Sequence, residues 1–442
     1  MSKKQLTPEQ LEAKAQKKAR RRKRTKRFFL SLFGIILAFI VITTVITVIG
    51  LNANLKKAKS FKKVEYSEAL PEFKNTGNGE WEIITDREIK VLQLTDVHLG
   101  GGWMSISKDS MALNTVASLV STEKPDFVIV TGDISYPVPF QAGTFNNKSA
   151  AKLFANLMES LGVYWTVCYG NHDTEAYSYY SREELTEFYE SENFPHCLMQ
   201  AGPEDVDGVG NQIFNVKNSD GIVVRSLVLF DSHSYVDGDY FGIFWKYDNI
   251  HQNQVDWYKS KMEDITKANY NKVMTSSDYA IYEKYGTPST VKSTLFMHIP
   301  LTEYLDAWNE FVANGYKDTE NVSYNYGTIG EKGKFIYCGI HDDELFETAS
   351  EIGSADSVFC GHDHLNNLSL TYKGIKLTYG MSIDYLAYSG ISKLGSQRGC
   401  GVLLIGTDGT LTSTNENYYQ EKYLSEYAKE EVTMQTLNEE LK

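Results

Sequence analysis

Carboxylate, amide and imidazole side chains are gathered in five short motifs along this chain of 442 residues. Side chains of these types hold divalent transition metals in proteins. Five of the nine histidines lie within the motifs, which therefore predict one metal site built from well-separated parts of the chain. In chain order, the motifs are Asp96-Val97-His98, Gly132-Asp133, Gly170-Asn171-His172-Asp173, His298 and Gly361-His362-Asp363-His364.

The expected chemistry is the cleavage of phosphate esters by a pair of metal ions. Two ions about 3.5–4 Å apart can activate a hydroxide and clamp the oxygens of a phosphoryl group. Such a pair needs a bridging carboxylate and about three further protein ligands on each ion. Asp133 is the expected bridge, because it ends an apolar run and follows Gly132, which lets the backbone come close.

The spacing of the other candidates also favours a shared site. Asp96 and His98 are two residues apart, so on an extended segment both side chains point to the same side. His362 and His364 have the same spacing, with the same consequence. The remaining two candidates are Asn171, which offers an amide oxygen, and His298.

Alternating apolar segments indicate how these motifs are positioned. Strands are expected at 89–94, 127–130 and 163–168, with helices at 107–122 and 150–161 between them. This order is typical of βαβ units. The first three motifs each follow one of the strands, and in open α/β sheets the ligand crevice lies beyond the carboxyl ends of the strands. We therefore expect an α/β fold with its site at that edge.

The second half of the chain is expected to be richer in strands. A helix is expected at 252–265, and residues 266–292 and 314–340 are expected to be irregular insertions that face the substrate. Residues 416–442 are expected to form a polar, helical tail. The expected strands are 212–216, 223–230, 294–297, 357–360, 368–372, 375–379 and 402–405.

Residues 28–51 are apolar and uncharged, and a basic run at 17–27 precedes them. About 20 apolar residues suffice for a helix to cross a bilayer, and positive residues beside a span stay in the cytoplasm. A cleaved signal peptide is the alternative, but its apolar core is normally only ~7–15 residues long. We expect an uncleaved signal anchor in the cell membrane, with residues 1–27 in the cytoplasm and the chain after the span outside.

Composition divides the rest of the chain. Residues 52–80 are expected to be a stalk, 81–415 a catalytic domain and 416–442 a tail. Residues 1–27 hold 12 Lys/Arg and two Glu, whereas the remaining chain holds 32 Lys/Arg and 55 Asp/Glu. A body this acidic is a poor nonspecific partner for nucleic acid, so none is expected. Five cysteines without a CxxC pair do not indicate a disulfide framework.

The order of the motifs resembles that of the calcineurin-like metallophosphoesterase superfamily over roughly residues 86–380. The segments QLTDVHLGGGW, PDFVIVTGD, GNHD, MHIPLTEY and VFCGHDHLNN are similar to its purple-acid-phosphatase-like branch. The resemblance implies a two-sheet α/β/α sandwich. It also implies a phosphate-ester substrate and two divalent or trivalent transition-metal ions, with manganese, iron and zinc as candidates.

The resemblance gives each site residue a role. An activated hydroxide would attack phosphorus while His172 protonates the leaving oxygen, and Asp173 could orient His172. The first ion would be held by Asp96, His98, Asp133 and His364, and the second by Asp133, Asn171, His298 and His362.

One position leaves two interpretations open. The spacing Gly132-Asp133-Ile134-Ser135-Tyr136 matches the one at which purple acid phosphatases place a tyrosine ligand to iron. Those enzymes carry glycine where this chain has His98, so His98 and Tyr136 would compete for one place. We favour His98 and expect a protein without the purple colour. The same segment lacks the second aspartate of the protein-phosphatase motif, which weakens that interpretation.

The expected function is that of a metal-dependent phosphoesterase. A phosphodiesterase or pyrophosphatase that acts on nucleotides, lipid head groups or wall precursors is the alternative, because the motifs serve monoesters and diesters alike. A binding protein without turnover on the same fold is less favoured, since all ligand positions and His172 are filled.

Overall fold

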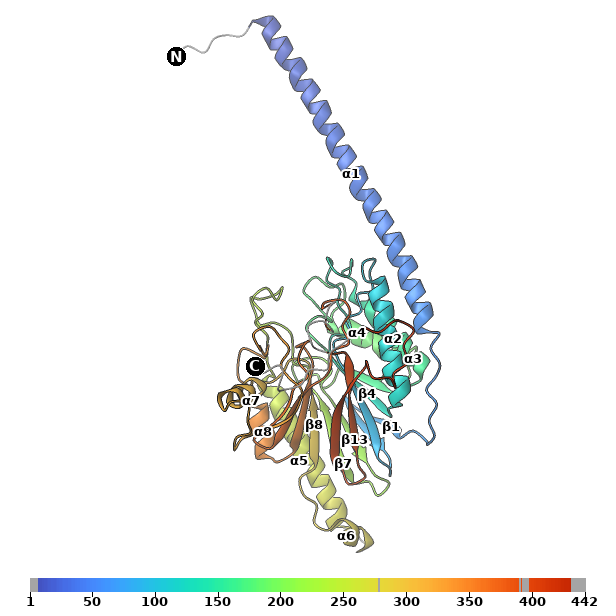
Figure 1. The fold of residues 1–442 in the computed structure, drawn as a ribbon, viewed down its shortest axis with the longest axis vertical. Helices are drawn as coiled ribbons and strands as arrows, with labels where there is room; N and C mark the ends of the chain where they lie inside the picture. Colours follow the sequence, from blue (N-terminus) through green and yellow to red (C-terminus); the bar gives the residue numbers. More distant parts are fainter. Residues whose placement is uncertain (1–6, 277–278, 389–390, 392–396, 431–442) are drawn as a thin grey trace. The chain divides into compact units, whose positions relative to one another are not determined.

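The computed structural model describes residues 7–276, 279–388, 391 and 397–430. The chain divides into two compact units, Met1–Gly50 and Leu51–Lys442. The first unit holds most of α1 (Pro8–Ala58), which is drawn in blue in Figure 1. This helix contains an apolar window long enough to cross a membrane, and no residue of that window is buried. Its length and composition agree with a membrane span and equally with a signal sequence.

The second unit is built on two β-sheets. The small sheet has the strand order β14-β13-β3-β4-β5 and the large sheet β1-β2-β6-β7-β8-β10-β12-β11-β9. The small sheet comprises β3 (Ile89–Leu94), β4 (Phe127–Thr131), β5 (Trp165–Cys168), β13 (Gly399–Ile405) and β14 (Leu411–Asn417). The large sheet comprises β1 (Glu72–Gly77), β2 (Glu80–Ile84), β6 (Gln212–Lys217), β7 (Val223–Leu229), β8 (Lys292–Phe296), β9 (Val322–Tyr326), β10 (Ala355–Cys360), β11 (Ser369–Tyr372) and β12 (Ile375–Tyr379).

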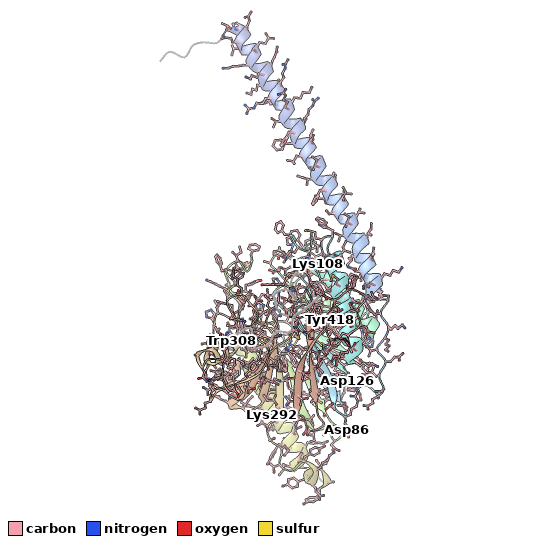
Figure 2. The ribbon with its side chains drawn as sticks, viewed as in Figure 1. Asp86, Lys108, Asp126, Lys292, Trp308 and Tyr418 are labelled. Atoms are coloured by element: carbon pink, nitrogen blue, oxygen red, sulfur yellow. The ribbon has the colours of Figure 1, made fainter. Side chains whose placement is uncertain are left out.

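Helices cover the outer faces of the sheets. One outer cluster contains residues of α2 and α3 packed on the small sheet, and another contains residues of α5, α7 and α8 packed on the large sheet. Tyr418 and Trp308, labelled in Figure 2, belong to the first and second of these clusters. The helices are α2 (Ile106–Glu123), α3 (Asn147–Leu161), α4 (Arg182–Tyr189), α5 (Gln252–Met274), α6 (Tyr279–Tyr285), α7 (Thr302–Ala313) and α8 (Leu345–Glu351).

A third cluster fills the space between the two sheets. It joins residues of the small sheet, such as Ile129, to residues of the large sheet, such as Phe214 and Phe296. Every residue of β4 is buried, as expected for a strand that is covered on both faces. The two-sheet α/β sandwich expected from the sequence is confirmed.

Three expectations about individual segments are wrong. Residues 266–292 and 314–340 are not wholly irregular, because α5 continues to Met274, α6 follows it, and β9 lies in the second segment. Residues 416–430 contain no helix, and the remainder of the expected tail lies outside the described residues. Tyr418 and Tyr423 are buried, so aromatic packing rather than helical periodicity holds this segment on the body.

The segment expected to be a stalk takes part in the fold. Ala58 is fully buried, and β1 pairs antiparallel with β2 at the edge of the large sheet. Strand β1 has no buried residue, so it lacks the apolar alternation by which a half-buried strand is recognised. Backbone pairing with β2 and the half-buried ring of Phe73, which packs against Phe127 and Tyr164, hold it in place.

Glu303, in the first turn of α7, gives the fold a testable pH dependence. Burial raises its pKa to about 8, with a further contribution from Asp343 and Glu347. The folded state therefore holds this proton more tightly than the unfolded state does. The resulting stabilisation is fully present below about pH 4.5, the ordinary value, and is lost as the pH rises through about 8.

Replacement of Glu303 by glutamine should therefore raise the melting temperature at pH 8 and flatten its fall between pH 5 and 8. Thermal unfolding followed by circular dichroism measures both. Glu351→Gln, at an exposed position at the end of α8, is the matched control and should leave the slope unchanged. An unaltered slope in Glu303→Gln would contradict the assignment.

Candidate metal centre

The carboxyl ends of two sets of parallel strands meet at one edge of the sandwich. Strands β3, β4 and β5 are mutually parallel, and so are β8 and β10. Asp96, Asp133 and Asn171 follow the first three strands, and His298 and His362 follow the other two. The edge therefore collects side chains from five separate connections.

Four of the predicted ligands form one buried cluster. Ligand atoms of Asp96, His98, Asp133 and His364 all lie within 4.8 Å of one another. His98 Nε2 is 3.2 Å from Asp133 Oδ2, and His364 Nε2 is 3.5 Å from Asp96 Oδ1. Two carboxylates and two imidazoles at this spacing form a donor set for one transition-metal ion.

The other predicted ligands form a second group around His298, which also contacts Asp133. His298 Nε2 lies 3.1 Å from Asn171 Oδ1, 3.2 Å from Asp133 Oδ2 and 3.3 Å from His362 Nδ1. Asp133 Oδ2 thus faces both His98 and His298. This oxygen is placed as a bridge between two positive centres would require.

Two imidazoles of the site are held neutral by their surroundings, and two are held as cations. His298 Nδ1 lies 2.8 Å from the carbonyl oxygen of Thr131 and donates to it, so in the neutral ring Nε2 carries a lone pair. Burial and the neighbouring His298 hold the pKa of His362 well below its usual value. Burial and His98 lower the pKa of His364 to about 3. His362 and His364 are therefore neutral, the form that metals bind. Burial lowers the pKa of His98 and of His298, but neighbouring carboxylates outweigh it, raising the pKa of His98 well above its usual value and that of His298 to about 9. These two rings would release a proton when a metal binds.

Asp384 contacts two of these histidines and carries no motif in the sequence. Its carboxylate lies 3.3 Å from His98 Nδ1 and 3.7 Å from His364 Nδ1. The backbone N–H groups of Leu386, Ala387 and Tyr388 also donate to it. Burial opposes ionisation, but His98 outweighs it and holds the pKa of Asp384 below its usual range. A carboxylate behind a metal-binding imidazole fixes its tautomer and orientation.

Asp384→Asn should therefore weaken the binding of one ion and spare the other. Loss of such an outer carboxylate typically costs about 10–100-fold in metal affinity. Metal titration of the stripped protein, with bound ions counted by mass spectrometry, measures the change. Asp363→Asn is the control, because Asp363 accepts from Tyr379 and Asn366 instead of a histidine. Equal loss in both variants would contradict the role of Asp384.

Several site residues have left-handed backbone conformations, which direct their side chains into the site. The φ angles of Asp96, His98, Asp133 and His362 are 48°, 50°, 55° and 77°. Non-glycine residues rarely adopt such angles, and they cluster at functional sites where the surrounding structure enforces them. The expectation that 96 and 98 lie on an extended segment is therefore wrong. Both side chains reach the site because the backbone turns at each residue.

His172 is paired with Glu175 rather than with Asp173. Its Nδ1 lies 2.6 Å from Glu175 Oε1. Asp173 instead accepts from the backbone N–H groups of Asp133, Ser135 and Gly170, so it holds two site loops together. The expectation that Asp173 orients His172 is wrong, because a turn of the chain brings Glu175 to the ring.

Tyr136 lies beside the cluster, and its hydroxyl is turned away from it. The ring centroids of Tyr136 and His98 are 4.8 Å apart, but Tyr136 donates its hydroxyl proton to Gln141 at 2.8 Å. Burial raises the pKa of Tyr136 well above its usual value, which disfavours a phenolate ligand. Of the two residues, His98 and not Tyr136 contributes a ligand atom to the cluster.

An aromatic cavity of about 850 Å³ opens directly onto the cluster. His172, His362 and His364 form part of its wall, as does Glu175. A cavity of this size accommodates an organic group beside a phosphate bound at the predicted ligands. We call the strand ends that carry these ligands the metal edge. The aromatic lining of the cavity consists of Tyr136, Tyr177, Tyr235, Phe241, Trp245, Tyr247, Tyr337 and Tyr388.

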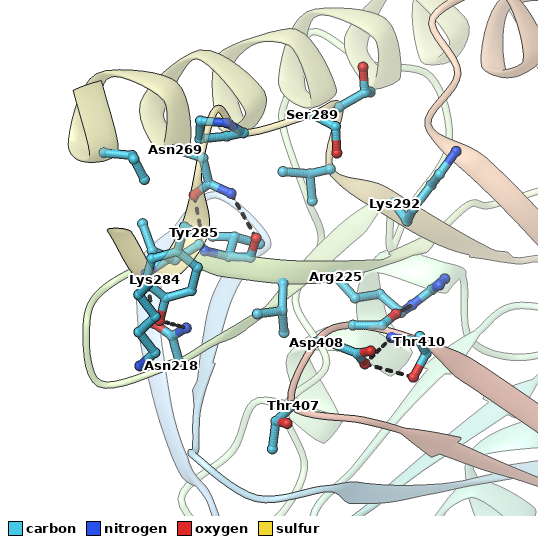
Figure 3. Close-up of a pocket in the computed structure, with 18 of the residues that line it drawn as sticks. Asn218, Arg225, Asn269, Lys284, Tyr285, Ser289, Lys292, Thr407, Asp408 and Thr410 are labelled. Atoms are coloured by element: carbon cyan, nitrogen blue, oxygen red, sulfur yellow. Dashed lines mark hydrogen bonds between the residues drawn. The ribbon is translucent and has the colours of Figure 1, made fainter. Parts of the chain in front are cut away.

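A second cavity, of about 960 Å³, lies where β8 begins and thus away from the metal edge. Figure 3 shows that polar side chains line it. Its buried cation, Arg225, is held by Asp356, Thr294 and the carbonyl oxygen of Gly409. Because these groups already satisfy Arg225, we assign the chemistry to the aromatic cavity.

The comparison with protein families agrees with this geometry. The calcineurin-like phosphoesterase family matches residues 89–366, which extend from β3 through the last histidine motif. The chain belongs to this family.

Individual relatives are distant. "Probable inactive purple acid phosphatase 14" of Arabidopsis thaliana is 26% identical over 71% of this chain and 74% of its own length. "Phosphatase DCR2" of Saccharomyces cerevisiae is 27% identical over 74% of this chain and 55% of its own length. A solved structure of a dimetal phosphatase from Danio rerio has a TM-score of 0.42 and 10% identity, covering 75% of this chain and 99% of its own.

Proposed function

We propose that this chain is a metal-dependent hydrolase that cleaves phosphate esters at the edge described above. The observation that carries the proposal is the position of Asp133 Oδ2, 3.2 Å from both His98 Nε2 and His298 Nε2. A buried carboxylate oxygen between two imidazole groups is the arrangement expected of a bridging ligand. Membership of the phosphoesterase family supports the same chemistry.

The ligand atoms divide into two sets around this bridge. Two bound ions would supply a nucleophilic hydroxide at neutral pH and neutralise the charge of the phosphoryl group. Nitrogen and oxygen donors without thiolate suit manganese, iron or zinc. One set would be Asp96, His98, Asp133 and His364, and the other Asp133, Asn171, His298 and His362.

His172 would deliver a proton to the leaving oxygen. Glu175 accepts the Nδ1 proton, so Nε2 is the nitrogen free to exchange a proton with the substrate. Burial lowers the pKa of His172, but the charge of Asp133 and the hydrogen bond to Glu175 outweigh it and raise the pKa. A protonated imidazole in the wall of the cavity suits a general acid.

The names of the relatives support two functions. The plant relatives are named probable inactive phosphatases, whereas the yeast relative is named a phosphatase. A binding protein without turnover is therefore the second candidate. The hydrolase is favoured because the predicted ligand positions and His172 are all filled by residues capable of their roles.

We place the catalytic unit outside the cytoplasm of the cell. The basic run at 17–27 directly precedes the uncharged stretch 28–51, and positive residues beside a span remain cytoplasmic. The apolar window of α1 is long enough for the span.

Turnover by the full-length chain in detergent tests the proposal. The protein would be stripped with chelator, reloaded with Mn²⁺ and given p-nitrophenyl phosphate or bis-p-nitrophenyl phosphate. We expect metal-dependent hydrolysis, and the preferred ester separates a monoesterase from a diesterase. Absence of turnover with two ions bound per chain would favour the binding protein.

A further inference from the structure

The loop that follows β7 exposes a concentrated set of large apolar side chains. Tyr240, Phe241, Ile243, Phe244 and Trp245 each have 62–68% of their surface exposed. Isolated exposed apolar residues are ordinary, but a contiguous patch marks a surface that meets another apolar phase. We name residues 237–247 the rim loop.

The rim loop has a defined internal structure. Asp239 is 3% exposed, and its carboxylate accepts hydrogen bonds from the backbone N–H groups of Phe244 and Lys246. Gly242 N–H donates to the carbonyl oxygen of Asp239. Because the backbone N–H groups of the loop bind the buried Asp239 carboxylate, the backbone faces the protein and the apolar side chains face outward.

The base of the rim loop contacts the metal centre. Tyr235 and Tyr247 form an isolated β-bridge that closes the loop. The Tyr247 ring lies 4.3 Å from the ring of His362, and the Tyr235 hydroxyl accepts from the amide of Asn171. Phe241 and Trp245 belong to the wall of the 850 Å³ cavity. Whatever binds the exposed side chains of the rim loop therefore lies next to the opening of this cavity.

The chain enters the second unit at this same edge of the sheets. Asn54 is 4% exposed and donates through Nδ2 to the carbonyl oxygen of Ile106 at 2.9 Å. Ile106 is the first residue of α2, directly after the loop that contains Asp96 and His98. The uncharged stretch ends at Leu51, three residues before Asn54, or about 5 Å along a helix.

The exposed rim loop and the nearby entry of the chain together point to a membrane as the partner of this surface. A span that ends near Leu51 would leave only Asn52 and Ala53 before Asn54, which is bonded to the start of α2, so the chain leaves the span next to the edge that carries the candidate site. Tryptophan and tyrosine are enriched at membrane interfaces, and phenylalanine occurs on the apolar face of segments that bind there. An aromatic cavity beside that surface suits the apolar part of a lipid.

We propose that the rim loop inserts into the surface of the bilayer in which α1 is anchored, and that the substrate is a phosphate ester of a membrane lipid. The cavity receives the apolar portion next to the phosphate, and the phosphate reaches the ligand edge. This inference rests on the proposed function for its substrate, but its membrane contact is independent of turnover.

Depth-dependent quenching tests the membrane contact. The full-length chain, in lipid nanodiscs, would carry a bimane label on Phe244→Cys or on Tyr279→Cys. Tyr279 is 73% exposed on α6, beyond the far end of α5 (Figure 1), and is the matched control. Unmodified protein corrects for labelling of the native cysteines. We expect quenching by doxyl-labelled lipid at 244 and not at 279. No quenching at either position, or equal quenching at both, would overturn the membrane contact.

Hydrolysis of two substrates by one preparation tests the substrate class. Ile243→Ser with Phe244→Ser removes apolar contacts at positions outside the cavity wall, and Tyr279→Ser is the control. We expect the double variant to lose at least about fivefold in phosphatidic acid hydrolysis within the disc and to retain p-nitrophenyl phosphate turnover. Unchanged lipid hydrolysis would overturn the role of the rim loop. Hydrolysis of the soluble ester without any lipid hydrolysis would overturn the substrate class, whereas loss of both in the parent chain would contradict the proposed function itself.

Discussion

Asp133→Asn should abolish the capacity of the chain to hold two metal ions. The carboxylate accepts the N–H of His172 at Oδ1 and faces His98 and His298 at Oδ2. An amide of the same shape is neutral and cannot bridge two cations. We expect no more than one ion per chain and a loss of turnover beyond the roughly 10–100-fold that an outer-shell substitution costs. Metal content by mass spectrometry and p-nitrophenyl phosphate hydrolysis measure the two effects.

Asp126→Asn is the matched control for this substitution. Asp126 precedes the same strand, β4, and its buried carboxylate pairs with Arg87. Its replacement should lower stability and leave the ion count at two. Two ions retained by Asp133→Asn would contradict the bridging role and remove the main support for the proposed function.

His172→Ala should slow the reaction most for esters with poor leaving groups. A general acid contributes about 10²–10⁴-fold when the leaving oxygen needs a proton. An alkyl phosphate needs that proton, whereas p-nitrophenolate leaves without much assistance. We therefore expect a large fall in kcat for the alkyl ester, a smaller fall for p-nitrophenyl phosphate and no change in metal content. Steady-state kinetics on both esters measure the difference.

His196→Ala provides the control for the loss of a histidine. His196 Nδ1 lies 2.6 Å from Glu159 Oε2, the same pairing and distance as His172 and Glu175. Its backbone carbonyl accepts from the N–H of Trp165, the first residue of β5, so it lies at the end of that strand away from Asn171. It should turn over both esters at the parent rate. Equal losses on both esters in His172→Ala would argue for a role in substrate binding instead of proton transfer.

The strands that carry the site could be predicted because their patterns are local. Strand β3 was expected at the residues where it occurs, and β4 within one residue, since each is an apolar run closed by a motif. Strands β1, β9 and β14 were missed. Strand β1 has no buried residue to mark it. Strand β9 does alternate between less and more exposed residues, but it is short and lies in a segment rich in Asn, Ser, Gly and Tyr, and each of the two pairs with a neighbouring strand.

The sequence by itself determined the family, the two-sheet fold and the residues that meet at the metal edge, because motif order and strand ends are properties of the chain. Only the tertiary structure decided how those residues are held. Asp384 lies far from His98 in the sequence and 3.3 Å from it in space, and Glu175 rather than Asp173 reaches His172. Such partners carry no local signal, because a carboxylate acquires its role from the imidazole that folding brings against it.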